Sequence, residues 1–207
     1  MTNTGDHLET EQKYDASADF VLPKLGLLPE LGGRRPAAPR RLFLSATYYD
    51  TENLDLLKHK ITLRRRVGGD DEGWHLKLPM RQDTRQEMHA PLDDGASGVP
   101  ARLAAQVEDI TAGGRLRPVA ILDTERTVVA LPGPPGNAQV EVADDRVTAI
   151  RFGEPEDRPM TWREIEVEAL SQDSRAAALL KTVGQALREA GARPSASGSK
   201  LARVLQS

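Results

Sequence analysis

The chain has 207 residues, no cysteine, 39% apolar residues and a formal net charge of −3. The lack of cysteine excludes disulfides and thiolate metal sites, and the small negative charge gives no overall attraction to nucleic acid or to an anionic membrane. No apolar run approaches the roughly 20 residues that span a bilayer, and the polar start MTNTGDH lacks a signal-peptide core. We therefore expect one cytoplasmic globular domain over residues 1–207.

The first predicted strand has one charged face. In the run HLETEQKYD, Glu9, Glu11 and Lys13 occupy alternate positions, so an extended chain projects all three side chains to the same side. Clustered carboxylates repel one another unless cations lie between them, and hard divalent cations prefer oxygen ligands. This segment therefore indicates a metal site.

The rest of the chain alternates between short strands and helices. A short helix interrupted near Pro23 is expected over 17–31, and a Gly/Pro/Arg loop follows it. Strands at about 42–49, 60–67, 74–78 and 84–90 predict an antiparallel meander, and a helix is expected over 98–114. Further strands are expected at about 118–131, 138–150 and 161–169. A last helix is expected to begin at an Asp173 or Ser174 cap and to stop at Gly191.

Charge is distributed unevenly over these strands. Arg64 and Arg66 share the face opposite Leu63, and in the last strand Glu164, Glu166 and Glu168 share the face opposite the apolar residues. For any single strand, a solvent-exposed face explains the pattern well. Taken together, basic middle strands and acidic outer strands favour a sheet that closes with its charged face inward and its apolar face covered by helices. Arginine suits phosphate there, because its planar fork donates two parallel hydrogen bonds.

Seven motifs in chain order resemble the CYTH domain, or triphosphate tunnel metalloenzyme, family. They are Glu9-x-Glu11-x-Lys13, Arg64-x-Arg66, LKLP with Lys77, Arg85-x-Glu87, Arg126, the strand with Glu141 and Asp145, and EIEVE. The resemblance implies an α+β fold in which an eight-stranded antiparallel β-barrel forms a tunnel with a charged interior and helices outside. It also implies hydrolysis of the terminal phosphoanhydride of a linear triphosphate with two divalent ions, Mg²⁺ or Mn²⁺.

The resemblance also assigns residue roles. The implied metal ligands are Glu9 and Glu11, a last-strand pair that is either Glu166 and Glu168 or Glu164 and Glu166, and, in a second-metal or water-orienting role, Glu141 and Asp145. The implied phosphate clamp is Lys13, Arg64, Arg66, Lys77, Arg85, Arg126 and Lys200, of which Lys13, Arg126 and Lys200, with Glu9 and Glu11, are the expected catalytic residues. Ion pairing with the tunnel glutamates is the structural alternative for each basic residue. Tyr48 or Tyr49 corresponds to a tyrosine that some members use near the attacking water.

One position departs from the family pattern. Some members carry lysine where this chain has Thr124, two residues before Arg126, so the assistance of that lysine is absent here or is supplied elsewhere. A non-catalytic polyphosphate- or nucleotide-binding module therefore stays open.

Inorganic triphosphate is the favoured substrate, because the chain contains few aromatic residues for reading a base. Thiamine triphosphatase and nucleoside triphosphatase activities are the alternatives, and adenylate cyclase is less favoured. We expect a triphosphate or polyphosphate partner and no specific nucleic acid. The terminal SGSKLARVLQS resembles the point at which some relatives continue into a helical, histidine-rich domain associated with polyphosphate.

Overall fold

A computed structural model describes residues 7–8, 10–79, 85–95, 98–133, 138–153 and 159–206 of the chain. Glu9, expected to be a metal ligand and a catalytic residue, lies outside the described residues. Arg85 is described in its backbone alone, so its expected place in the phosphate clamp also lies outside what the structure describes.

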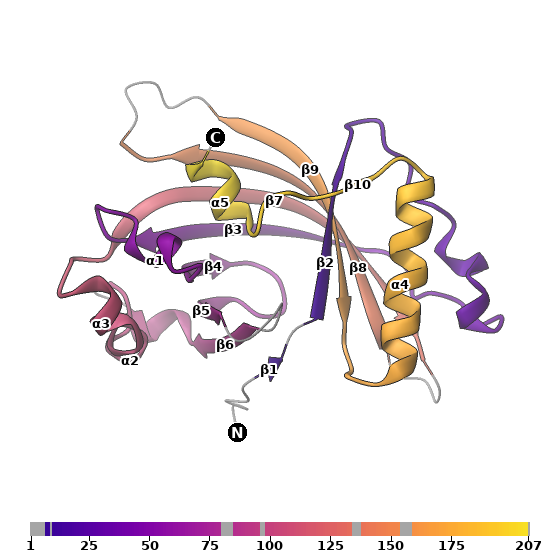
Figure 1. Ribbon diagram of the computed structural model, residues 1–207, viewed down its shortest axis with the longest axis horizontal. Helices are drawn as coiled ribbons and strands as arrows, with labels where there is room; N and C mark the ends of the chain where they lie inside the picture. Colours follow the sequence, from indigo (N-terminus) through magenta and orange to yellow (C-terminus); the bar gives the residue numbers. More distant parts are fainter. Residues whose placement is uncertain are drawn as a thin grey trace.

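The described strands form one antiparallel sheet (Figure 1). Its order is β1-β6-β5-β4-β3-β7-β8-β9-β2-β10. The strands are β1 (His7–Leu8), β2 (Thr10–Ala16), β3 (Arg40–Asp50), β4 (Thr62–Val67), β5 (Gly73–Pro79), β6 (Arg85–Ala90), β7 (Arg117–Pro132), β8 (Ala138–Arg151), β9 (Met160–Ala169) and β10 (Arg193–Pro194). If β1 and β2 are counted as one N-terminal segment, the expected eight strands are present, and the two-residue β10 is added to them.

The N-terminal segment connects the two sides of this sheet. β1 pairs with β6, whereas β2 pairs with β9, and a single residue separates β1 from β2. The same short segment therefore reaches from the meander β3–β6 to the last long strand. This arrangement brings the first and last predicted strands together, as the sequence analysis expected from a tunnel fold.

Helices pack on both faces of the sheet. They are α1 (Asp55–Lys58), α2 (Ala101–Ala104), α3 (Glu108–Thr111), α4 (Ser174–Glu189) and α5 (Lys200–Leu205), with 3₁₀ turns η1 (Leu25–Leu27), η2 (Pro29–Leu31), η3 (Leu92–Gly95) and η4 (Ala105–Val107). The helix expected over 17–31 is wrong: η1 and η2 are single turns, because Pro23 and Pro29 interrupt the backbone hydrogen bonds of any longer helix. The helix expected over 98–114 is broken at Val107, whose φ of −121° leaves the helical range.

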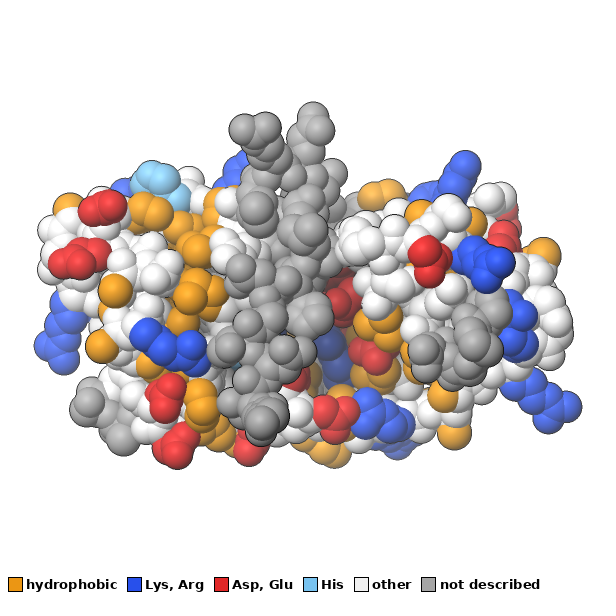
Figure 2. All heavy atoms as spheres, turned by 90° about the horizontal axis from the view of Figure 1, so that it is seen from below, with side chains coloured by type: hydrophobic (Ala, Val, Ile, Leu, Met, Phe, Trp, Pro, Cys, Tyr) orange, Lys and Arg blue, Asp and Glu red, His pale blue; other side chains and the backbone are white. Residues whose placement is uncertain are grey.

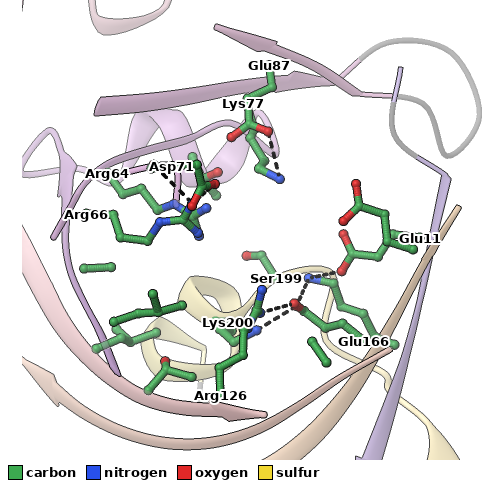
Figure 3. A pocket seen from close by; sticks show the side chains of 18 of the residues that line it. Glu11, Arg64, Arg66, Asp71, Lys77, Glu87, Arg126, Glu166, Ser199 and Lys200 are labelled. Atoms are coloured by element: carbon green, nitrogen blue, oxygen red, sulfur yellow. Dashed lines mark hydrogen bonds and ion pairs between the residues drawn. The ribbon is translucent and has the colours of Figure 1, made fainter. Parts of the chain in front are cut away.

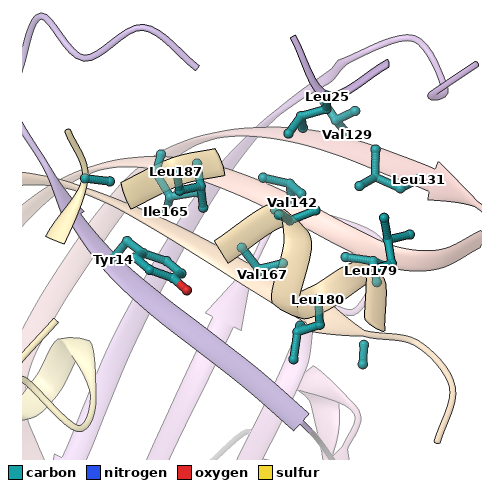
Figure 4. Packing of buried hydrophobic residues seen from close by; sticks show 14 of the residues in the cluster. Tyr14, Leu25, Val129, Leu131, Val142, Ile165, Val167, Leu179, Leu180 and Leu187 are labelled. Carbon is teal, nitrogen blue, oxygen red and sulfur yellow. The ribbon is translucent and has the colours of Figure 1, made fainter. Parts of the chain in front are cut away.

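The longest helix, α4, packs on the outside of the sheet. Its cap is Asp173, whose side chain accepts hydrogen bonds from the backbone N–H groups of Arg175 and Ala176 at 2.8 and 2.9 Å. The buried stripe of α4, which includes Leu179 and Leu187, contacts a cluster on β2, β7, β8 and β9 (Figure 4). That cluster occupies the strand face opposite the glutamates of β9. The apolar-outside expectation is therefore confirmed for this half of the sheet.

The other two clusters complete the packing. α2 and the adjoining turn η4 cover the outer face of β4 and β5 through Leu103 and Val107, which pack against Leu63 and Trp74. α5 instead packs on the charged face of the sheet, where Leu201 and Val204 join a cluster from β3, β7 and β8. This last helix thus lies at the end of the tunnel, and it carries its first residue, Lys200, toward the tunnel interior.

Candidate active site

One cavity collects most of the predicted site residues (Figure 3). It encloses about 130 Å³ and is lined from β2, β3, β4, β5, β6, β7, β8, β9 and the start of α5. The lining contains equal numbers of basic and acidic residues. The basic ones are Lys13, Arg64, Arg66, Lys77, Arg126 and Lys200, and the acidic ones are Glu11, Asp71, Glu87, Glu141, Glu166 and Glu168. Figure 2 shows red and blue side chains together in the central recess of the molecule. Charge therefore lines the interior, as the alternation of the strands predicted.

Three carboxylates form a row across three neighbouring strands. Glu11 of β2 lies opposite Glu168 of β9, and Glu168 lies opposite Glu141 of β8. Burial and the nearby Glu11 raise the pKa of Glu168 to about 7. A row of like charges that holds a carboxyl at such a pKa is chemically suited to a hard cation with oxygen ligands. We call Glu11, Glu141 and Glu168 the carboxylate row.

A second acidic group surrounds Lys200. Its Nζ lies 2.9 Å from Asp145 Oδ2, 2.6 Å from Glu164 Oε1 and 2.6 Å from Glu166 Oε1. Burial alone would lower the pKa of Lys200, but the three carboxylates outweigh it and raise that pKa well above its usual value. We call Asp145, Glu164 and Glu166 the lysine cage. Asp145 and Glu164 lie behind Lys200 and do not line the cavity, whereas Glu166 does.

Arg126 and Lys13 also neutralise this cage. Arg126 donates from Nε and Nη2 to the two carboxylate oxygens of Asp145 at 2.7 and 2.6 Å, and Nη2 also lies 2.5 Å from Glu166. Lys13 bridges Glu11 and Glu166 at 3.1 and 3.2 Å. The ion pairs that the sequence analysis gave as the structural alternative are therefore present for both residues, within the cavity wall.

The opposite wall is basic. Arg64 and Arg66 of β4 point into the cavity, and the Nε atoms of both are buried without a hydrogen-bond partner among the described residues. Burial and the adjacent Arg64 and Arg126 lower the pKa of Arg66 to about 9, so its guanidinium is still charged at neutral pH. Buried donors without acceptors are costly, so these arginines are not placed here for stability, and both side chains line the cavity.

The two candidate tyrosines have different surroundings. Tyr48 lines the cavity and accepts a hydrogen bond from Arg64 Nη1 at 3.4 Å, whereas Tyr49 packs against Trp74 on the outer face with ring centroids 5.0 Å apart. Burial would raise the pKa of Tyr48, but Arg64 outweighs it and the net shift is downward. Thr124 also lines the cavity, so the position where some relatives have lysine does face the site.

Sequence reasoning missed three lining residues. Glu87 was noted within a motif, but its place as a partner of Lys77 at 3.3 Å and of His75 Nδ1 at 2.8 Å was not foreseen. Asp71 follows the β4 strand and forms an ion pair with Arg66, and Ser199 caps α5 by accepting from Ala202 N at 3.0 Å. The sequence could have predicted α5, because Ser199 is a typical helix cap and Leu201, Val204 and Leu205 are spaced for one helical face.

The comparisons with known proteins agree with this geometry. The family model described as CYTH domain matches residues 7–204. The chain belongs to the CYTH family. Two curated relatives, the uncharacterized proteins MT2285 and Rv2226 from two strains of Mycobacterium tuberculosis, are each 39% identical over 208 residues. The match covers 96% of this chain and 40% of each relative, so the chain spans well under half the length of the curated relatives.

Solved CYTH-like structures share the fold. A Bacillus halodurans protein, provisionally named an adenylate cyclase, superposes with a TM-score of 0.65 at 15% identity and covers 97% of this chain and 99% of its own. HpAC1 from Hippeastrum, provisionally named an adenylyl cyclase and described as having a dominant triphosphatase activity, gives a TM-score of 0.51 at 17% identity, with 94% and 93% covered. CYTH proteins act on small-molecule triphosphates with metal ions. In this chain the carboxylates of Asp145, Glu164 and Glu166 lie close enough together to hold an ion, but Lys200 occupies the space among them. No described helix has the length and apolarity of a membrane-spanning segment.

Proposed function

We propose that this CYTH domain hydrolyses the terminal phosphoanhydride of a linear triphosphate in a reaction that depends on a divalent metal ion. The observation that carries the proposal is the meeting, in one cavity, of a carboxylate row on β2, β8 and β9 with buried arginines on β4. Acidic and basic lining residues are equal in number, so a polyanion would leave the cavity negatively charged unless cations accompanied it. A phosphate chain with a divalent ion meets that requirement.

The basic residues would hold the phosphate chain. Arg64 and Arg66 have buried Nε donors to offer, and Arg126 is fixed in direction by its two bonds to Asp145. Guanidinium groups held in place before the substrate arrives stabilise the charge that develops on the transferred phosphoryl group without reorganising. Lys13 and Lys77 would complete the clamp, because each presents an ammonium to the cavity and is already oriented by a glutamate.

Glu11, Glu141 and Glu168 are the residues that we propose to hold Mg²⁺ or Mn²⁺, and Glu166 borders them. The raised pKa of Glu168 supports this role, because it reports carboxylates that lack sufficient positive charge nearby. The bound ion would supply positive charge to the phosphate oxygens and promote ionisation of the attacking water. Tyr48, whose hydroxyl faces the same cavity, is the proposed hydrogen-bonding partner for the substrate or the water.

Inorganic triphosphate is the substrate that we propose, on the basis of the cavity's size. The cavity volume of about 130 Å³ lies below the roughly 300–1,000 Å³ of pockets that enclose drug-sized ligands. A compact anion therefore suits the interior better than a nucleotide that would have to be enclosed whole. Thiamine triphosphate and ATP are the competing substrates, with the organic group outside the cavity. The triphosphatase activity named for HpAC1 agrees with hydrolysis.

Phosphate release tests the proposal. Tripolyphosphate, longer polyphosphate, thiamine triphosphate and ATP would each be incubated with Mg²⁺, Mn²⁺ or a chelator. We expect metal-dependent release that is fastest with tripolyphosphate, and loss of release in Glu11→Gln. The matched control is Glu125→Gln, on the exposed outer face of β7. Tight binding of tripolyphosphate without release from any substrate would instead establish the binding module that Thr124 kept open.

A further inference from the structure

The lysine cage is saturated with the protein's own positive charge. The side chains of Asp145, Glu164 and Lys200 are 0%, 5% and 10% exposed, so the ion pairs among them are shielded from water. Arg126 reaches Asp145 and Glu166 from one side, and Lys13 reaches Glu166 from another. Arg203 Nη1 also lies 3.9 Å from Glu164, so the three carboxylates face four cations. Any further cation among them would meet strong repulsion in this low-dielectric environment.

The carboxylate row has no such balance. Among the described residues, Lys13 is the cation within ion-pair distance of Glu11, and it is shared with Glu166 of the cage. Glu168 and Glu141 lie beside Glu11 in the strand register, and all three line the cavity. Both acidic groups have members on β8 and β9, yet the lysine cage holds an ammonium whereas the carboxylate row opens to the cavity.

Lys200 is also held in position by its own helix. It is the first residue of α5, whose cap is the Ser199 side chain, and Leu201, Val204 and Leu205 of the same helix are buried against β3, β7 and β8. Figure 3 shows the Lys200 side chain entering the cavity wall beside Arg126 and Glu166. If α5 stays in place, the ammonium can leave the cage only by breaking its ion pairs with three carboxylates. That would leave buried negative charges without this partner, at a large cost in free energy.

We propose that Lys200 occupies the place of a second divalent ion, so that this chain binds one metal ion, at the carboxylate row, where the family resemblance implies two. The inference deepens the proposed function and rests on it for the role of the bound ion. The lysine cage serves instead as a permanent cationic wall that positions Arg126 and Lys13 toward the phosphate chain. Lys200 is then a positioning residue whose charge substitutes for that of a metal.

Counting bound Mn²⁺ tests this inference without any turnover. The full chain would be titrated with Mn²⁺ and the bound ions counted by electron paramagnetic resonance and by calorimetry. We expect one ion per chain in the wild type and a twofold increase, to two, in Lys200→Met, because the cage then carries unbalanced negative charge. Lys181→Met, at an exposed position of α4, is the matched control and is expected to keep one ion. Two ions in the wild type, or no increase in a folded Lys200→Met, would overturn the proposal.

A second variant locates the ion even if Lys200→Met does not fold. Glu168→Gln alters the carboxylate row and leaves the cage intact, so we expect the single ion of the wild type to be lost. An ion retained in Glu168→Gln would lie in the cage, contrary to the proposal. Phosphate release measured on the same wild-type sample separates the two claims. One bound ion without release contradicts the proposed hydrolysis alone, whereas release with two bound ions contradicts the role of Lys200 alone.

Discussion

Glu11 of β2 and Glu168 of β9 are direct cross-strand partners, with Glu141 on the other side of Glu168. Like charges placed opposite each other destabilise a sheet, so this row is a cost that folding alone does not explain. We infer that the row is kept for function at the expense of stability. Because the carboxylates repel one another, protons and metal ions should both change the stability of the fold.

The contribution of Glu168 to stability should fall as the pH rises from about 4.5 to about 7. Burial and Glu11 raise the pKa of Glu168 in the folded chain to about 7 from the value of 4.5 expected in the unfolded chain. In that window the folded state binds more protons than the unfolded state, so raising the pH disfavours folding. Urea unfolding of Glu168→Gln, compared with the wild type at several pH values, measures the effect. The variant should gain stability relative to the wild type as the pH rises through this window, whereas buried His75, whose pKa is lowered to about 3, affects both proteins alike. A difference between the two proteins that does not change with pH would refute the assignment.

Divalent metal should reverse this loss above pH 7. An ion that binds the folded state at the carboxylate row stabilises it by mass action, to an extent of about 2.7 kcal/mol when its concentration is 100 times the dissociation constant. We expect Mg²⁺ or Mn²⁺ to raise the melting temperature more at pH 8 than at pH 5, where Glu168 is protonated. Thermal melts with the ion and with a chelator measure the shift. A shift of equal size at both pH values would exclude Glu168 as a ligand.

Arg126→Met should destabilise the fold strongly. The substitution leaves Asp145, whose side chain is 0% exposed, with Lys200 as its remaining ion-pair partner among the described residues. Breaking one side of a buried ion pair costs about 3–5 kcal/mol, and we expect the lower end of that range because Lys200 stays in place. The control is Arg146→Met on the exposed face of β8, which should lie within about 0.5 kcal/mol of the wild type. Equal unfolding free energies for the two variants would contradict this interpretation of Asp145.

Gly184→Ala should also be destabilising, although alanine is the better helix former. An added Cβ at this position of α4 would lie 2.2 Å from Tyr14 Oη and 2.6 Å from Gln12 Oε1. Since Tyr14 is buried beneath the helix, α4 or β2 would have to move, at a cost of about 1–3 kcal/mol. Chemical denaturation measures the loss. Lys181→Ala, at an exposed site of the same helix, is the control, and a stabilised Gly184→Ala would show that the helix and strand are less tightly packed than described.

Alternation along the strands was sufficient to predict the two faces of the sheet. Leu63 is buried in an outer cluster and Arg64 beside it faces the cavity, as period-two spacing requires. Alternation could not predict which residues of one strand face line the cavity and which are covered by another element. Glu164 and Glu168 share a strand face, yet Glu164 lies behind Lys200 and Glu168 lines the cavity, because the difference arises from where α5 returns to the sheet.

Helix continuity was the less predictable feature. The spacing of Leu103 and Val107 fits one helical face, and both residues are buried as expected, but the chain changes direction between them and Ile110. Short segments that pack on a strongly curved sheet follow the surface beneath them, and periodicity in the sequence carries no information about that curvature.

The N-terminal segment that joins β6 to β9 imposes an order on assembly. Residues 10–16 are synthesised well before their partner strand, Met160–Ala169. Glu11 and Lys13 therefore have no β9 neighbours until that strand has been made. A nascent chain cannot assemble its carboxylate row before β8 and β9 are available alongside β2.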